Sequence, residues 1–201
     1  MRLAQAHSDW ALGFEDEVWW SRVAQPHLHS WAEAPLRLLE LTPPPDDRAP
    51  KALACYGVLM RRPASPATPE RMLLRFVDGR PVSEVTIAFL QWSCQRLARQ
   101  GVKVWALIWD NASWHVSRAV HIWIRAHNRQ VKRTGQGVRI LACFLPSKSP
   151  WLNPIEPKWL HGKRAIVEPA RLLSPAEVAD RVCARYGCVH EPHLKAPEKV
   201  S

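Results

Sequence analysis

The pattern of apolar and polar residues divides the chain into strands and helices. Residues 10–18 alternate with a period of two, which is typical of a strand that turns one face toward a core. Shorter apolar runs bounded by Pro, Gly and charged residues predict further strands over residues 52–60, 72–77, 102–109 and 138–145. The run over residues 102–109 is apolar except for Lys103, as expected of a central strand that is covered on both sides.

Helices are predicted between these strands. From residue 83 the apolar residues recur with a period of 3.6, with Ser83 as N-cap and Gly101 just past the end. A second helix is predicted over residues 117–133, before a Gly-rich turn, and a third begins near Asn153. The resulting β-β-β-α-β-α-β-α order predicts an α/β, ribonuclease H-like fold, with a central mixed sheet of about five strands flanked by helices. We expect one domain over residues 1–175, followed by a C-terminal helix and a disordered tail over residues 176–201.

Three carboxylates occupy positions that suit catalysis. Asp16 lies in the apolar row of the first strand, where an ionised carboxylate is costly unless it is paired or bound to metal. Asp110 ends an apolar run, and Glu156 stands where a loop should turn into a helix. Strand ends and loop-to-helix junctions often present catalytic groups. For the first acid, Glu15 and Glu17 are alternatives; they point to the opposite face, where we expect them to be solvated or to contact a partner.

Asp110 and Glu156 each have a purely structural alternative. Asp followed by Asn is common in turns, so Asp110 could simply end its strand. Asn153 as N-cap with Glu156 three residues later would form a capping box without any catalysis. Pro157 opposes this second interpretation, because proline disfavours helical geometry in the residue before it.

The charge of the chain favours a polyanionic partner. The formal net charge is +10 and the pI is about 9.9 over 201 residues. The 45 residues between Asp110 and Glu156 hold seven Lys or Arg and no acid. Each cation that neutralises a phosphate releases a condensed counterion, which favours DNA, although a charged residue can equally lie on a solvated face. The candidate phosphate contacts are Arg118, Arg125, Arg129, Lys132, Arg133, Lys148, Lys158, Lys163 and Arg164.

Other features limit the class of protein. The longest apolar run, over residues 52–60, has nine residues, far from the ~18 of a membrane span, so we expect no membrane association and a cytoplasmic location. The five cysteines are scattered and indicate reduced thiols rather than disulfides. Four zinc-ligand types, Cys183, Cys188, His190 and His193, fall within eleven residues, but their spacing fits no usual zinc motif.

Two segments resemble a known family. Trp109-Asp-Asn-Ala-Ser-Trp-His115 resembles the Asp-Asn-Ala and His motif of Tc/mariner-type DDE transposases, including those of bacterial insertion sequences. Residues 145–159, which contain Ser-Pro-Trp-Leu-Asn-Pro-Ile-Glu, are similar to the second and longer signature of that family. Phe14-Glu-Asp-Glu17 is similar to the acidic end of its first strand, so the resemblance spans about residues 10–165.

This resemblance implies a DNA strand transferase with Asp16, Asp110 and Glu156 as its metal-binding triad. Two Mg²⁺ or Mn²⁺ ions about 4 Å apart would clamp the scissile phosphate. Oxygen ligands suit such hard cations. Asn111 and His115 would support the site, and a His in this position could also be an ordinary surface residue. Transposon-end and target DNA and further copies of the chain are the implied partners, in association with the nucleoid.

The chain departs from the family pattern in two places. The interval between Asp110 and Glu156 is longer than is usual in the family, and we place the extra residues at 128–137. The chain also begins almost directly with its first predicted strand, without the helix-turn-helix region that reads transposon ends. A separate helix-turn-helix polypeptide is therefore a candidate partner. The alternative is an inactive transposase remnant that retains only DNA binding or dimerisation; a different ribonuclease H-like nuclease is disfavoured by the Asn-Pro-Ile-Glu motif.

Overall fold

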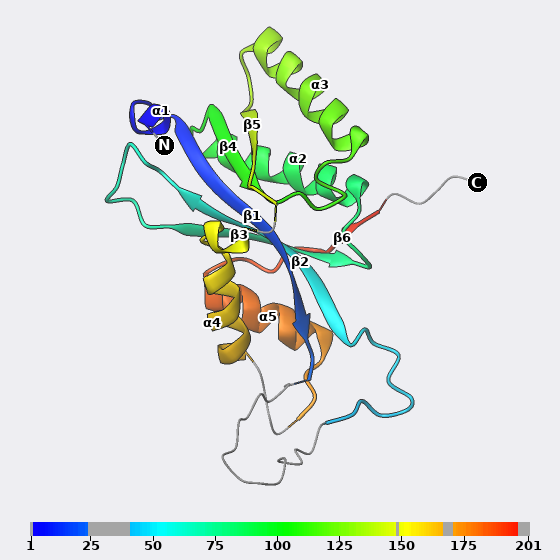
Figure 1. Ribbon diagram of the computed structural model, residues 1–201. Helices are drawn as coiled ribbons and strands as arrows, with labels where there is room; N and C mark the ends of the chain where they lie inside the picture. The colour runs from blue at the N-terminus through cyan, green and yellow to red at the C-terminus, as the bar shows by residue number, and fades with distance from the viewer. Residues whose placement is uncertain (1, 24–40, 148, 167–170, 197–201) are drawn as a thin grey trace, which may run out of the picture.

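A six-stranded mixed sheet forms the centre of the molecule (Figure 1). The computed structural model describes residues 2–23, 41–147, 149–166 and 171–196. The sheet has the order β5-β4-β1-β2-β3-β6. Its strands are β1 (Trp10–Ser21), β2 (Ala52–Arg61), β3 (Arg71–Asp78), β4 (Val104–Trp109), β5 (Arg139–Phe144) and β6 (Leu194–Lys195).

The pairing of the strands follows the predicted ribonuclease H-like plan. β1, β2 and β3 form an antiparallel meander, and β4 and β5 then add in parallel on the other side of β1. The five predicted strands are all present, and the sixth, β6, pairs in parallel with β3 through Val77 and Leu194. The sheet therefore extends one strand beyond the expected five.

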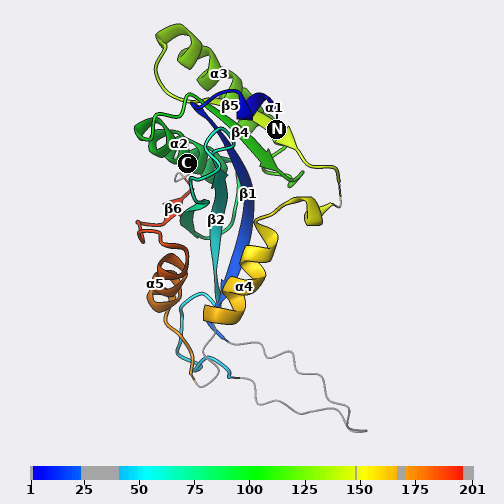
Figure 2. The ribbon, with the colours of Figure 1, turned by 90° about the vertical axis from the view of Figure 1, so that its left-hand side faces the viewer.

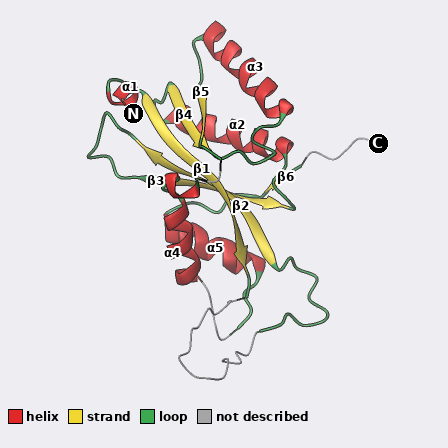
Figure 3. Ribbon diagram, in the orientation of Figure 1, coloured by secondary structure: helices red, strands yellow, loops and turns green. Residues whose placement is uncertain are grey.

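Helices cover both faces of the sheet (Figures 2 and 3). One face carries α2 (Ser83–Arg99) and α3 (Arg118–Thr134), and the other carries α4 (Glu156–Ile166) and α5 (Pro175–Tyr186). The short helices α1 (Arg2–Gln5) and η1 (Pro150–Leu152) complete the described structure. Two buried apolar clusters, one beneath each pair of helices, hold the layers together.

The alternation along β1 assigns each acidic residue to a face. Leu12, Phe14 and Val18 belong to the cluster beneath α4 and α5, whereas Ala11 belongs to the cluster beneath α2 and α3. Successive side chains of a strand point to opposite faces. Residue 16 therefore faces α4, as the alternation predicts, and residues 15 and 17 face the α2 and α3 layer.

Two predicted helix starts are wrong. Helix α2 begins at Ser83 itself, with Val82 as N-cap, and the Ser83 hydroxyl bonds to that of Ser117 at 2.8 Å. Helix α4 begins at Glu156 rather than near Asn153. The capping box that was the structural alternative for Glu156 does not form, since Asn153 Oδ1 has no hydrogen-bond partner among the described residues. The Asn153 amide instead donates to the carbonyl of Glu15 in β1, at 3.0 Å. This tertiary bond ties the start of α4 to the strand that carries Asp16.

The C-terminal part of the described chain packs on the same core as the rest. Val178, Ala179 and Val182 of α5 are buried in the cluster that also contains Val18 of β1, and β6 extends the sheet. The division at residue 175 stays a prediction, and residues 197–201 of the expected tail lie outside the described residues. Within the described ranges, the helices are all too short or too polar to cross a membrane.

Candidate active-site cleft

Asp16, Asp110 and Glu156 line one cleft of about 360 Å³. They come from β1, from the residue after β4 and from the first residue of α4. β1 and β4 are parallel neighbours, with Phe14 opposite Ile108, so the two aspartates follow this pair at the same level of adjacent strands. Helix α4 runs along β1 and brings Glu156 to them (Figure 2). The structure thus brings together the three carboxylates that the sequence separates by up to 140 residues.

Asp16 is held in place by Trp159 of α4. The indole N–H donates to the Asp16 carboxylate at 2.9 Å, and the ring is buried. Gly57 of β2 lies opposite Asp16 in the strand register and makes room for this ring. A Cβ atom at Gly57 would lie 2.3 Å from the indole. The close approach of α4 to the sheet therefore depends on a glycine at this position.

The three carboxylates influence one another electrostatically. Burial, followed by the charges of Glu156 and Glu17, raises the pKa of Asp16 to about 8. Burial and then the charge of Asp110 raise the pKa of Glu156, while Lys163 lowers it. Such mutual repulsion is relieved by a cation, and three carboxylates are the oxygen donors that hard divalent ions prefer. These residues fit a divalent-metal site.

Asp110 is fixed by hydrogen bonds from its own loop. Its Oδ1 accepts from the backbone N–H of Ala112 and contacts Nδ1 of His115, both at 2.9 Å. The His115 bond is the main reason that the pKa of Asp110 is lowered. Asn111, beside it, donates its amide to the carbonyl of Leu145 at 2.7 Å and so joins the loops that follow β4 and β5.

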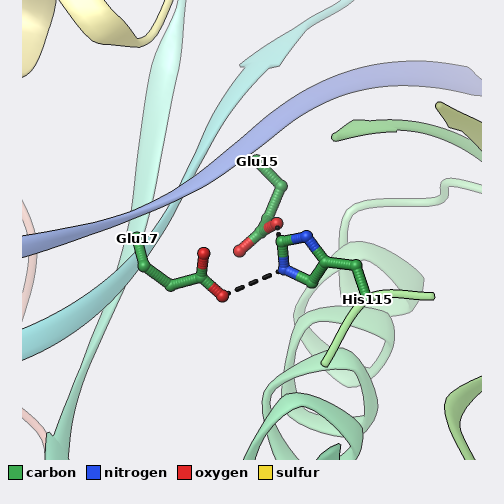
Figure 4. A group of neighbouring side chains, drawn as sticks. All are labelled: Glu15, Glu17 and His115. Atoms are coloured by element: carbon green, nitrogen blue, oxygen red, sulfur yellow. Dashed lines mark hydrogen bonds and ion pairs between the residues drawn. The ribbon is translucent and has the colours of Figure 1, made fainter. Parts of the chain in front are cut away.

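His115 also contacts the acids on the opposite face of β1, as Figure 4 shows. Its Nε2 lies 2.9 Å from Glu17 and 3.2 Å from Glu15. Trp114 adds an indole N–H to Glu17 at 2.6 Å. Burial lowers the pKa of His115, but the carboxylates of Glu15, Asp110 and Glu17 outweigh this and raise it to about 11. Both ring nitrogens of His115 therefore face acidic side chains, which favours its protonated form. Burial also raises the pKa of Glu15.

This buried cluster corrects two expectations. Glu15 is 1% exposed and Glu17 contacts His115, so neither is a solvated residue or one left for a partner. His115 is fully buried, so it is not an ordinary surface residue. Ligand atoms of Glu15, Glu17 and His115 lie within 4.8 Å of one another and could hold an ion. The three residues are largely enclosed, however, whereas Asp16, Asp110 and Glu156 line an open cleft.

The predicted phosphate-contacting residues fall into two groups. Those on α3 and those on α4 are all exposed, but the two helices lie on opposite faces of the sheet. Lys163 is the member whose charge acts on Glu156, and Lys158 pairs with Glu70 at 3.2 Å. Lys148 lies outside the described residues. The basic residues therefore do not form one continuous strip.

Sequence reasoning missed several residues that support the site. Trp159, Gly57 and Asn153 hold α4 against β1, and Glu15 and Glu17 hold His115. Trp159 lies within the second family signature, which was the available signal for its importance. Gly57 carries no local signal, because its role depends on which elements pack together. Glu15 was visible only as an alternative to Asp16, and its contact with His115 likewise depends on packing.

The sequence matches a known family. A sequence model of the family described as DDE superfamily endonuclease matches residues 67–177, which include Asp110 and Glu156. No curated protein matches the chain.

Solved structures of the Mos1 transposase share the fold. The Mos1 paired-end complex with the left transposon end has a TM-score of 0.61 and 16% identity, over 90% of this chain and 48% of that chain. The Mos1 mariner paired-end complex with Mn has a TM-score of 0.55 and 15% identity, with the same coverage. The Mos1 strand transfer complex has a TM-score of 0.54 and 14% identity, again over 90% and 48%.

The chain thus spans about half the length of these transposases. At such low identity they establish the fold alone, which is ribonuclease H-like. The family match covers more than half of the chain and contains two of the three cleft carboxylates. This protein belongs to the DDE superfamily endonuclease family.

Proposed function

We propose that this chain is the catalytic domain of a transposase, which cleaves DNA strands and joins them to target DNA in a metal-dependent reaction. The observation that carries the proposal is the convergence of Asp16, Asp110 and Glu156 on one open cleft. Family membership supports an endonuclease, and the fold shared with Mos1 transposase supports transposition as its purpose.

The cleft carboxylates are the proposed ligands of two Mg²⁺ or Mn²⁺ ions. DDE endonucleases use divalent metal ions, and one of the similar Mos1 structures contains Mn. Bound in pairs, such ions activate the attacking oxygen and stabilise the leaving oxygen of the scissile phosphate. The protein supplies three carboxylates, which an incoming cation relieves of their mutual repulsion.

The remaining residues position these ligands. Trp159 orients the Asp16 carboxylate by its indole N–H, and His115 orients Asp110 by its imidazolium. Asn153 fixes the start of α4 and hence Glu156. The charge of Lys163 acts on Glu156 and lowers its pKa, so Lys163 is the proposed cation nearest in effect to the cleft.

DNA is the proposed partner, through the exposed cations of α3 and α4. The Mos1 structures contain paired transposon ends, and by analogy we propose that this chain acts on transposon ends and target DNA as a homo-oligomer. A separate helix-turn-helix polypeptide would supply end recognition. We further propose that the element is a bacterial insertion sequence, and that the protein acts in the cytoplasm at the nucleoid.

The test is the substitution Asp110→Asn. This change keeps the shape of the side chain and removes the charge that holds a divalent ion, whereas DNA affinity depends on cations elsewhere. With Mg²⁺ or Mn²⁺ and the end-binding polypeptide added, we expect the wild type to release 3′-hydroxyl ends. We expect the variant to cleave at least ~10³-fold more slowly at nearly unchanged affinity. Asp46→Asn, a change of an exposed aspartate outside the cleft, is the matched control.

Two outcomes would contradict the proposal. Cleavage by Asp110→Asn at the wild-type rate would make Asp110 a turn residue. The second outcome is that the wild type, with the end-binding polypeptide present, binds DNA but does not cleave it with any divalent metal. That result would favour an inactive remnant that retains only DNA binding.

A further inference from the structure

Two histidines of the C-terminal segment face each other. His190 lies between α5 and β6, and His193 immediately precedes β6. Their Nε2 atoms are 3.3 Å apart. Neither residue belongs to the cleft or contacts the His115 cluster, so the proposed function leaves this pair without a role.

A carboxylate stands behind each ring. Asp180 of α5 contacts His190 Nδ1, and Asp78 at the end of β3 contacts His193 Nδ1, both at 2.7 Å. An ionised carboxylate can only accept a hydrogen bond, so each Nδ1 carries a hydrogen, and in the neutral form of each ring Nε2 presents its lone pair to the other ring. Two opposed lone pairs repel unless something lies between them. A shared hydrogen is one solution at this separation of 3.3 Å, and a metal ion that both lone pairs bind is another.

A metal ion between the two nitrogens fits this distance. Zinc binds imidazole nitrogen at about 2.0–2.1 Å, so two nitrogens 3.3 Å apart subtend roughly 107° at the ion, close to the tetrahedral angle. A carboxylate that accepts the second ring N–H of each ligand is the usual outer shell of a histidine–zinc site. We propose that His190 and His193 form a two-histidine binding site for a transition-metal ion of the zinc class, completed by water.

The surrounding structure holds both histidines in place before any ion binds. The Phe76 ring of β3 is 1% exposed and packs against both imidazoles, with centroids 5.8 and 5.5 Å away. His193 is fixed by the pairing of β6 with β3. Glu191, between the two histidines, accepts from the Trp92 indole at 2.9 Å and pairs with Arg75 and Arg96. Ordered ligands lose little conformational entropy on binding.

Only two of the four zinc-ligand types that lie close together in the sequence take part in this pair. Cys183 is buried in the core, and the Cys188 thiol points to the carbonyl of Met72 at 3.2 Å, so the two cysteines do not join the histidines. The histidine rings remain partly exposed, at 29% and 21%, and an ion can reach them from solvent. Imidazole favours zinc, copper and nickel, whereas carboxylate oxygen suits the magnesium or manganese of the cleft. The two sites should therefore take different metals.

The experiment titrates the full chain, without a histidine tag, with Zn²⁺ by calorimetry and with Co²⁺ by visible absorption. Excess Mg²⁺ is present to compete at the carboxylates of the cleft. We expect one equivalent of Zn²⁺ to bind, and His193→Gln to abolish that binding. Asp180→Asn, which leaves both histidines intact, should weaken the affinity by ~10–100-fold through the outer shell. His161→Gln, on exposed α4, is the matched control and should bind as the wild type does.

Thermal melts provide a second measurement. In chelator, circular dichroism should show that all variants are folded, and added Zn²⁺ should raise the melting temperature of the wild type but not of His193→Gln. The proposal fails if the wild type binds no Zn²⁺ under these conditions. It also fails if His193→Gln and Asp180→Asn both retain wild-type affinity. DNA cleavage is not measured, so neither result bears on the function proposed for the cleft.

Discussion

His115 connects the two faces of β1 at the scale of a single residue. One ring nitrogen holds Asp110 at the cleft, and the other contacts Glu17 and Glu15 behind the strand. The sequence marked this histidine through its motif but gave no sign of its burial. Its partners could not be foreseen, because Glu15 and Glu17 reach it only when β1 pairs with β4 and the loop after β4 folds back.

Amide substitutions can separate the two contacts of His115. In His115→Asn the side-chain amide lies near the former position of Nδ1 and can still reach Asp110. In His115→Gln it lies near the former position of Nε2 and can reach Glu17. We expect both variants to lose on the order of 3 kcal/mol of stability, because buried carboxylates lose their cation. His115→Asn should nevertheless cleave DNA faster than His115→Gln and need less Mn²⁺ for half-maximal rate. Equal metal requirements in the two variants would reduce His115 to a structural residue.

The Asp16 carboxylate makes stability depend on pH. Its folded pKa of about 8 lies above the ordinary value of 3.8, so the folded state holds the proton more tightly than the unfolded state. Stability from this group is complete below pH ~4 and is lost as pH rises toward 8. In chelator at pH 8, Asp16→Asn should therefore be more stable than the wild type, by on the order of 1–3 kcal/mol.

Urea unfolding between pH 4 and pH 8 measures this difference. The wild type and Asp16→Asn should have nearly equal free energies of unfolding at pH 4, and the difference should grow as pH rises. Added Mn²⁺ should stabilise the wild type more than the variant, because only the wild type offers the full carboxylate set. Parallel curves across the range would show that Asp16 is not held in a repulsive, buried position.

At the scale of elements, periodicity predicted most of the fold. The alternation of β1 placed Asp16 on the face opposite to Glu15 and Glu17, which is as the structure has it. Helix α4 starts three residues later than the local capping pattern suggested, and the Asn153 side chain makes a tertiary bond to β1 that this pattern does not reveal. β6 has two residues, too few to show any period.

The packing of α4 on the sheet can be tested at Gly57. Because a Cβ there would meet Trp159 at 2.3 Å, Gly57→Ala should displace the indole and with it the N–H that orients Asp16. We expect a loss of about 1–3 kcal/mol of stability and a marked loss of DNA cleavage. Unfolding in urea measures the first effect. In a Trp159→Leu background, Gly57→Ala should lower the free energy of unfolding much less. If it lowers it as much as in the wild type, the strain does not come from contact with the Trp159 indole.

At the scale of the whole molecule, composition predicted the charge but not its distribution. The excess of cations and the long acid-free interval were visible in the sequence. Their division between opposite faces follows from the topology, since α3 and α4 cover different layers. Glu156 of α4 lines the cleft, and Lys163 on the same helix acts on its charge. We therefore expect the α4 cations to contact DNA bound at the cleft more than the α3 cations do.

Salt-dependent binding separates the two groups. One variant replaces the α4 cations Lys158, Lys163 and Arg164 by Ala, and a matched variant replaces Arg125, Arg129 and Arg133 of α3, so that net charge falls equally. Each lost phosphate contact should flatten the plot of log affinity against log salt by about 0.9. We expect the α4 variant to lose roughly two to three such contacts for DNA of any sequence, and the α3 variant to lose fewer. Equal losses would mean that affinity follows net charge alone, whereas a loss confined to one DNA sequence would indicate that these residues read bases rather than phosphates.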